Sequence, residues 1–362
     1  MTSLERVAVV GTGLIGTSVA LAAARAGADV SGWDADPAVT LTAAELAGFR
    51  PADSLGDAVG DAQMVVVATP IGSVVPSVVA CLASSSAIVT DVGSVKTPIV
   101  QQVVETASAD AARYVPGHPM GGSERSGPEH ASASVLDGIV WAITPHERSG
   151  AAEVDAVEAW VASFGARPVR LEPERHDRLV AFVSHLPQVA STALMSLAAS
   201  EEAGEPEILL LAAGGFRDLT RLAASNPALW SDILLANRRA TGAAIDLYVD
   251  RLARLRDEIV GERGADVEST FDEAKQARLR LSAKPTVRSG VAVLQIEVPD
   301  RPGALASLTA VLGEGDVNIE DLQIVHSPEG GRGAVHLTVA ADAAERATAV
   351  LASDGLDPVR LA

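Results

Sequence analysis

A glycine-rich loop near the N-terminus constrains the fold of this 362-residue chain more than any other feature. In VAVVGTGLIGTSVALAAARAG, an apolar strand pattern leads into Gly11, Gly13 and Gly16 and continues as an apolar helix pattern. Gly11 permits a tight turn, Gly13 lets backbone approach a pyrophosphate, and Gly16 lets the helix pack closely on the strand. The helix N-terminus favours the phosphate charge. The loop therefore predicts a dinucleotide site.

An acidic residue follows the loop at the spacing that such sites use. Asp34 ends the second predicted strand, VSGWD, 18 residues after Gly16. Its carboxylate can accept hydrogen bonds from the adenosine ribose hydroxyls and repels a 2′-phosphate, which favours NAD over NADP. Asp36 is an alternative for the same role. The predicted cofactor residues are Gly11, Gly13, Leu14, Ile15, Gly16 and Asp34.

The pattern of predicted secondary structure changes twice along the chain. From residue 5 to about 171, apolar β-rich runs, RYVPG among them, alternate with helical segments, which predicts a doubly wound α/β domain with a parallel sheet. From 173 to 282, apolar residues recur at helical spacing, which predicts an all-helical region. After the polar linker 283–290, the order strand, helix, strand, strand, helix, strand predicts a small βαββαβ module. The expected domains are 1–172, 173–284 and 289–362.

Charge and cysteine content exclude several classes of protein. The formal net charge of −19 argues against binding to nucleic acid or to an anionic membrane, so an anionic substrate needs a local cationic pocket. The single cysteine, Cys81, excludes an intramolecular disulfide and a cysteine metal cluster. The seven histidines show no metal-site spacing. We therefore expect a cytoplasmic protein without a bound metal.

Two segments raise the question of a membrane or a targeting sequence. The N-terminus lacks the charged, apolar and cleavage regions of a signal peptide. The stretch from Ala62 to Thr90 is uncharged and long enough to span a bilayer. Pro70, Gly72 and Pro76 divide it into strand, loop, helix and strand, which is typical of a buried parallel sheet. We therefore expect no membrane span there.

Polar side chains gather at the end of a predicted strand and in a following glycine loop. TDVGSVK brings Asp91, Ser94 and Lys96 to the carboxyl end of a strand, where open α/β sheets bind ligands. Lys96 is either an electrostatic contributor near the nicotinamide or a surface lysine on the next helix. PGHPMGGSERSG places His118 before two glycines, which is either a tight turn or a base beside a substrate.

The helical region carries two further candidates. His185 lies two residues before Pro187, which kinks a helix and frees a carbonyl. Its side chain therefore either points into a cleft or hydrogen-bonds that carbonyl in the core. Arg221 follows Gly214 in GGFRDLTRLAASNPALW and can hold a carboxylate through two hydrogen bonds. Alternatively, Arg221 forms an ion pair with Asp218.

Five segments, in this order, resemble the prephenate and arogenate dehydrogenases of tyrosine biosynthesis: GTGLIG, DVGSVK, GHPMGGSERSG, SHLPQ and GGFRDLTRLAASNPALW. The resemblance covers about residues 5 to 282 and implies NAD-dependent oxidative decarboxylation of prephenate, with arogenate as the alternative substrate. It implies that His118 takes the proton of the ring hydroxyl with help from Ser94. It also implies that Arg221 binds a carboxylate. The implied lining of the same pocket is His185, Gly214, Ser225 and Trp230.

The C-terminal segment VPDRPGALASLTAVLGEGDVNIEDLQI is similar to an ACT domain, an amino-acid-sensing module. The resemblance implies an aromatic amino acid as effector, with tyrosine the obvious ligand and phenylalanine and tryptophan open. The implied ligand residues are Asp300, Gly303, Ala304, Asn318 and Ile319. A plain dimerisation module is the alternative. The long apolar helix face after Pro227 favours a homodimer.

Two other functions are weaker interpretations. A β-hydroxyacid dehydrogenase shares the layout but requires a catalytic lysine in the helical region, and residues 173–274 contain none. A non-enzymatic sensor of NAD and an amino acid has no use for Ser94, His118, His185 and Arg221 together. An enzyme is therefore favoured.

Overall fold

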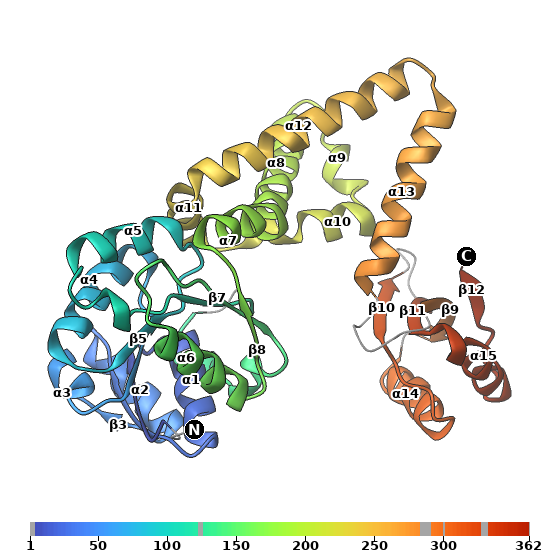
Figure 1. Cartoon of the computed structure of the whole chain (residues 1–362). Helices are drawn as coiled ribbons and strands as arrows, with labels where there is room; N and C mark the ends of the chain where they lie inside the picture. The colour runs from blue at the N-terminus through green and yellow to red at the C-terminus, as the bar shows by residue number, and fades with distance from the viewer. Residues whose placement is uncertain (1–3, 122–125, 283–290, 300, 327–331, 362) are drawn as a thin grey trace. The chain divides into compact units, whose positions relative to one another are not determined.

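The computed structural model describes residues 4–121, 126–282, 291–299, 301–326 and 332–361 (Figure 1). The chain forms two compact units. The first unit is Met1–Ala193 with Leu222–Leu247, and the second is Leu194–Arg221 with Tyr248–Ala362. The domain boundaries expected from the sequence remain predictions, because these units group residues by spatial proximity rather than by consecutive segments.

The first unit contains the predicted parallel sheet. Its strands follow the order β3-β2-β1-β4-β5, and all pair in parallel. They are β1 (Arg6–Val10), β2 (Asp29–Trp33), β3 (Arg50–Pro51), β4 (Met64–Val67) and β5 (Ile88–Asp91). The helices between them are α1 (Leu14–Arg25), α2 (Pro37–Ala47), α3 (Leu55–Val59) and α4 (Ile71–Ser84), and α5 (Thr97–Thr106) follows β5. The uncharged stretch 62–90 is therefore strand, helix and strand, as predicted.

A second, three-stranded sheet follows in the same unit. It contains β6 (Gly117–Pro119), β7 (Val140–Ile143) and β8 (Arg167–Arg170), with α6 (Ala151–Ser163) between β7 and β8. The segment RYVPG was expected to be a strand, but only a single bridge between Tyr114 and Val89 forms there. Pro116 has no N–H to donate, so the regular ladder begins at Gly117.

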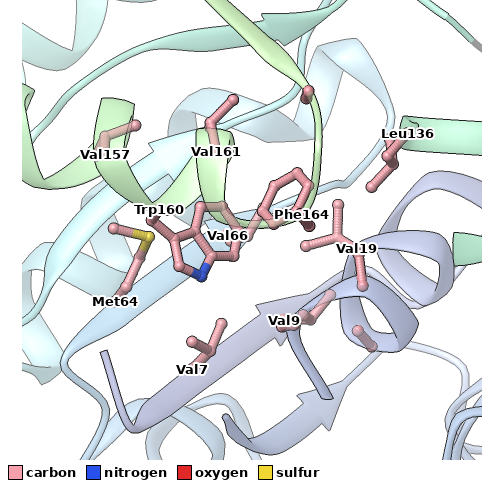
Figure 2. Close-up of a cluster of buried hydrophobic side chains, with 14 of the residues drawn as sticks. Val7, Val9, Val19, Met64, Val66, Leu136, Val157, Trp160, Val161 and Phe164 are labelled. Carbon is pink, nitrogen blue, oxygen red and sulfur yellow. The ribbon is translucent and has the colours of Figure 1, made fainter. Parts of the chain in front are cut away.

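Side chains on both faces of the parallel sheet are buried. Val7, Val9 and Val66 face one cluster, in which Trp160 of α6 and Phe164, the residue after α6, pack over the strands (Figure 2). The alternate strand residues face a second cluster beneath α4. Burial of both faces is typical of a parallel sheet between helices and explains the near-continuous valine runs of β1 and β4.

The region from 173 to 282 is helical throughout, as predicted. It comprises α7 (Pro173–Val180), a π-helical turn (Ala181–His185), α8 (Leu186–Glu201), α9 (Glu207–Leu210), α10 (Gly214–Thr220), a 3-10 turn (Arg221–Ala224), α11 (Pro227–Ala236), α12 (Arg238–Val260) and α13 (Gly264–Ser282). Asn226 caps α11, because its side-chain oxygen accepts hydrogen bonds from the N–H groups of Ala228 and Leu229.

One helical stretch in the described residues, Pro173–Glu201, is long and apolar enough to cross a membrane by length and composition. Its first half carries buried His176, Asp177 and His185, each hydrogen-bonded within the first unit. One face of this helix is therefore packed in the first unit through hydrogen-bonded polar side chains.

The C-terminal part of the second unit has the predicted βαββαβ order. Its four strands form an antiparallel sheet in the order β10-β11-β9-β12. The elements are β9 (Val291–Pro299), α14 (Ala304–Glu314), β10 (Asp321–His326), β11 (Arg332–Ala340), α15 (Ala344–Ser353) and β12 (Val359–Leu361). Leu294 and Ile296 of β9 lie fully buried in its own hydrophobic core.

Candidate active site

The three glycines of the loop have two different roles, close packing and access for a ligand. Gly11 has φ of +91°, and a Cβ there would lie 2.7 Å from the carbonyl of Ala68. A Cβ on Gly16 would lie 1.9 Å from the carbonyl oxygen of Gly11. A Cβ on Gly13 would meet nothing within 4 Å. Gly11 and Gly16 are therefore required by the turn and the helix contact, whereas Gly13 borders open space.

The two acidic candidates beside the loop have different roles. The Asp34 carboxylate accepts a hydrogen bond from the backbone N–H of Thr12 at 2.8 Å, so it lies against the glycine loop. Asp36 is exposed and caps α2 by accepting from the N–H of Ala38 at 2.9 Å. The geometry thus favours Asp34 as the ribose partner, because the Asp36 carboxylate serves the helix.

The loop fits a phosphate-bearing nucleotide. Helix α1 begins at Leu14, and its N-cap residue Gly13 has no side chain to cap it, so its first turn can present backbone N–H groups to an anion. The hydroxyl oxygens of Thr12 and Thr69 are buried and have no hydrogen-bond partner among the described residues. A ligand that supplies hydrogen-bonding groups at this end of β1 and β4 would satisfy them.

Lys96 is fully buried, which rules out the surface-lysine alternative. Its Nζ forms an ion pair with Asp91 and donates a hydrogen bond to the carbonyl oxygen of Gly117 at 2.7 Å. The other oxygen of Asp91 accepts from the Tyr114 hydroxyl at 2.9 Å. Burial lowers the pKa of Lys96, although Asp91 favours its charged form. This cluster ties the end of β5 to the residue that precedes His118.

His118 is half-buried on β6, and a second histidine contacts it. His118 Nδ1 lies 2.9 Å from His176 Nε2, and the rings meet edge to face. His176 Nδ1 lies 2.9 Å from Asp177 Oδ1. Burial, with His176, Lys96 and His185 nearby, holds the pKa of His118 well below its ordinary value. His118 is therefore a neutral imidazole at neutral pH.

His185 is buried in the π-helical turn that precedes Pro187. Its Nδ1 lies 3.2 Å from both the Thr241 hydroxyl and Asn237 Nδ2, so this ring nitrogen contacts side chains at the C-cap of α11 and in α12. Asn237 Nδ2 also donates to the Asp177 carbonyl at 2.9 Å, which identifies it as the amide nitrogen. His185 Nδ1 therefore accepts. Burial lowers the pKa of His185 to about 4, so its neutral ring carries the proton on Nε2.

The remaining predicted substrate residues fall in both units. In the first unit, the Trp230 ring packs edge to face on His185 at 6.1 Å between centroids. The Ser225 hydroxyl donates to Gln188 at 3.4 Å, and Ser94 is half-buried in the turn between β5 and α5. Gly214 begins α10 and Arg221 follows it, both in the second unit.

The predicted effector residues lie around the start of α14 and before β10. Gly303 has φ of +86° and immediately precedes Ala304 at the start of α14. Asn318 Nδ2 donates to Glu320 at 2.6 Å, and Ile319 lies before β10. Asp300 lies outside the described residues.

Three residues of the site, His176, Asp177 and Asn237, were not predicted from the sequence. His176 and Asp177 stand in PERHDRLV, a charged stretch that is indistinguishable from a solvated helix face by composition. Only the packing of α7 against the start of α5 buries them, and no local pattern encodes that contact. Asn237 stands at the C-cap of α11, where a polar residue is ordinary.

Comparisons with known proteins agree with this geometry. The family model described as prephenate dehydrogenase, nucleotide-binding domain, matches residues 19–170, and the model for its dimerization domain matches 172–273. The ACT domain model matches residues 292–352. These matches confirm the family that the sequence resembles and the ACT domain at its C-terminal end.

Curated relatives extend along most of the chain. Prephenate dehydrogenase of Bacillus subtilis (strain 168) is 28% identical over 348 residues, which cover 93% of this chain and 93% of the relative. Cyclohexadienyl dehydrogenase of Zymomonas mobilis is 31% identical over 294 residues, which cover 80% of this chain and all of the relative.

Solved structures agree with the relatives. Prephenate dehydrogenase from A. aeolicus, in complex with hydroxyphenyl propionate and NAD+, is 28% identical with a TM-score of 0.72 over 77% of this chain and 99% of its own. Synechocystis arogenate dehydrogenase is 28% identical with a TM-score of 0.68 over 76% of this chain and 99% of its own. The chain therefore belongs to the prephenate dehydrogenase family.

Proposed function

We propose that the protein catalyses the NAD-dependent oxidative decarboxylation of prephenate to 4-hydroxyphenylpyruvate. The observation that carries the proposal is a neutral, half-buried His118 beside the buried Asp91–Lys96 pair, in a chain with an open nucleotide loop. Arogenate, which carries an alanyl in place of a pyruvyl side chain, is the second candidate, because solved relatives bear both names.

The reaction removes a hydride and carbon dioxide from the substrate, and the proton of the ring hydroxyl moves to a base and back. Bound NAD+ supplies the hydride acceptor for C4 of the substrate ring. His118 takes the proton of the C4 hydroxyl, so a ketone forms as the hydride leaves. The resulting dienone loses carbon dioxide, and the electron pair of the broken C–C bond makes the ring an aromatic phenolate, which takes the proton back from His118. Formation of the aromatic ring provides the driving force. The protein therefore supplies mainly alignment, a base and charge recognition.

The glycine loop and Asp34 hold the nucleotide in this proposal. The N–H groups of Leu14 and Ile15, at the start of α1, would hold the pyrophosphate together with the Gly13 backbone. The Asp34 carboxylate would accept from the ribose hydroxyls and disfavour a 2′-phosphate. The orphan hydroxyls of Thr12 and Thr69 support a ligand in this position.

Each residue proposed for substrate recognition offers a group that suits a part of the substrate. His185, protonated on Nε2, is a hydrogen-bond donor suited to a carboxylate or carbonyl oxygen. Trp230 and Ser225 line the pocket beside it, and Ser94 assists at the hydroxyl. Arg221 binds a substrate carboxylate through its guanidinium, near the backbone of Gly214.

We also propose a cytoplasmic homodimer that binds neither nucleic acid nor membrane. Leu247, Leu252 and Ile259 of α12 expose 63%, 48% and 57% of their surface in the single chain. A row of large exposed apolar side chains on one long helix is a typical protein interface. The name of the family model that covers this helix, a dimerization domain, supports the same state.

A four-way assay tests the reaction and the cofactor together. Prephenate and arogenate are each tested with NAD and with NADP, following reduced nicotinamide by absorbance. We expect turnover of prephenate with NAD, and a far lower kcat/KM with NADP because Asp34 repels the 2′-phosphate. Absence of turnover in all four combinations would contradict the proposed function, and preference for arogenate would select the second candidate.

Replacement of His118 tests the base. His118→Asn keeps a polar side chain but cannot take the proton, so we expect kcat to fall by about 10²–10⁴-fold. NAD affinity, measured by fluorescence quenching, should change little. His336→Asn, in β11, is the matched control and should behave as the wild type. Turnover by His118→Asn within a few-fold of the wild type would remove His118 from the mechanism.

Two substitutions of Arg221 test the carboxylate contact. Arg221→Ala removes a charge-assisted hydrogen bond, so KM for prephenate should rise by about 10- to 100-fold while KM for NAD stays nearly constant. Arg221→Lys keeps the charge but loses the two-pronged geometry, so its KM for prephenate should lie between those of the wild type and Arg221→Ala. Equal effects on the two KM values would count against the contact.

The ACT-matching module is proposed to bind tyrosine through Gly303, Ala304, Asn318 and Ile319, with Asp300 also a predicted contact. Titration of the full chain with tyrosine, phenylalanine and tryptophan, by calorimetry and by inhibition of the assay, identifies the effector. We expect tyrosine to bind and to slow turnover. No binding by any of the three would instead favour the plain dimerisation module.

A further inference from the structure

A carboxylate and a second histidine stand behind the base in a single chain of hydrogen bonds. Asp177 Oδ1 lies 2.9 Å from His176 Nδ1, and His176 Nε2 lies 2.9 Å from His118 Nδ1. His176 and Asp177 expose only 1% and 5% of their surface. Water therefore competes little with either contact, and each hydrogen bond needs one defined donor.

The order of donors along this chain follows from Asp177. An ionised carboxylate only accepts, so the proton between Asp177 and His176 belongs to His176 Nδ1. With its one ring proton on Nδ1, His176 has an acceptor at Nε2. The hydrogen bond to His118 therefore requires a proton on His118 Nδ1. The other ring nitrogen of His118, Nε2, is left with its lone pair.

Asp177 is fixed in its ionised form by the start of α5. Its two oxygens accept from the backbone N–H groups of Lys96 and Thr97, each at 2.8 Å. Burial opposes ionisation, but hydrogen bonds from His176, Thr97 and Lys96 outweigh it and hold the pKa of Asp177 below its ordinary value. The carboxylate thus cannot rotate or take up a proton without breaking backbone hydrogen bonds.

We propose that His176 and Asp177 form a positioning pair that keeps His118 in the tautomer with a proton on Nδ1 and an unprotonated Nε2. This inference rests on the proposed function, in which His118 takes the hydroxyl proton. The transfer breaks the O–H bond and forms an Nε2–H bond, while the hydride leaves C4 for NAD+. The imidazolium that results still donates from Nδ1 to His176, so the same contact stabilises the charge.

The ionisable groups around His118 come from several elements. His176 and Asp177 belong to α7, Lys96 precedes α5, Asp91 ends β5, and His185 lies in the π-helical turn. Lys96 already has Asp91 and the Gly117 carbonyl as partners, and His185 Nδ1 accepts from Asn237. Among the groups that the structure describes around this ring, His176 is therefore the one that can accept a hydrogen bond from His118 Nδ1.

A matched pair of substitutions at His176 tests the proposal in the full chain. Gln and Met are similar in length, but only Gln offers an oxygen acceptor where His176 Nε2 lies. We expect His176→Met to lower kcat by about 10- to 100-fold, part of the contribution of a general base, and to leave KM values nearly unchanged. His176→Gln should restore most of the loss, because its oxygen still accepts from His118 Nδ1.

The pH profile of kcat distinguishes a change in the tautomer of His118 from a change in its pKa. A neutral imidazole changes tautomer without binding a proton, so the His176→Met deficit should be the same at neutral and alkaline pH. A deficit that disappears as the pH rises would mean a shifted pKa and would overturn the proposal. Equal kcat values for His176→Met and the wild type, or for His176→Met and His176→Gln, would also overturn it.

Two controls keep the outcome interpretable. Thermal unfolding of each variant shows whether it folds, and if His176→Met does not, His176→Leu takes its place as the acceptor-free variant. Failure of the proposed function is seen separately, as a wild type that turns over neither substrate or as an active His118→Asn. An inert His118→Asn beside a fully active His176→Met would overturn this inference alone.

Discussion

The carboxylate of Asp177 is the contact on which the arrangement of the site depends. It accepts hydrogen bonds from two consecutive N–H groups at the start of α5 and from the ring of His176. The first two join the end of the parallel sheet to helix α7, and the third orients a histidine toward the base. Because the carboxylate is buried, loss of any one donor leaves its negative charge only partly compensated. The three hydrogen bonds therefore depend on one another.

A second buried charge holds the base from the other side. Lys96 bridges Asp91 and the carbonyl of Gly117, so the residue before His118 is tied to the end of β5. Paired buried charges add little net stability, but they fix geometry because any displacement exposes an uncompensated ion. His118 is thus positioned through its backbone by Lys96 and through its ring by His176. A base held at both points needs little reorganisation when a substrate arrives.

The sequence was sufficient for features that local backbone geometry requires. Gly11 and Gly16 stand where no Cβ fits, and that demand produces a recognisable spacing. The doubly wound sheet, the helical region and the βαββαβ module followed from periodicity. Asp34 and Asp36 could not be separated, since the choice depends on which carboxylate caps α2. The strand expected at RYVPG failed at Pro116, where the ladder loses a donor.

Features that depend on contacts distant in the sequence were not predictable. Lys96 could be either buried or exposed until the position of Asp91 and Gly117 was known. His176 and Asp177 lie about sixty and eighty residues from the groups they contact, within a stretch that resembles a solvated helix. The resemblance supplied His118, but the residues that support it came only from the fold.

The protonation of the His118 ring, which we expect to be neutral with its proton on Nδ1, can be measured directly. Nitrogen NMR of the full chain with ¹⁵N-labelled histidine, with His118 assigned by comparison with His118→Asn, reports the protonation of each ring nitrogen at neutral pH. We expect a protonated Nδ1 and an unprotonated Nε2. A proton on Nε2 with a bare Nδ1, or a ring that exchanges between the two forms, would contradict it.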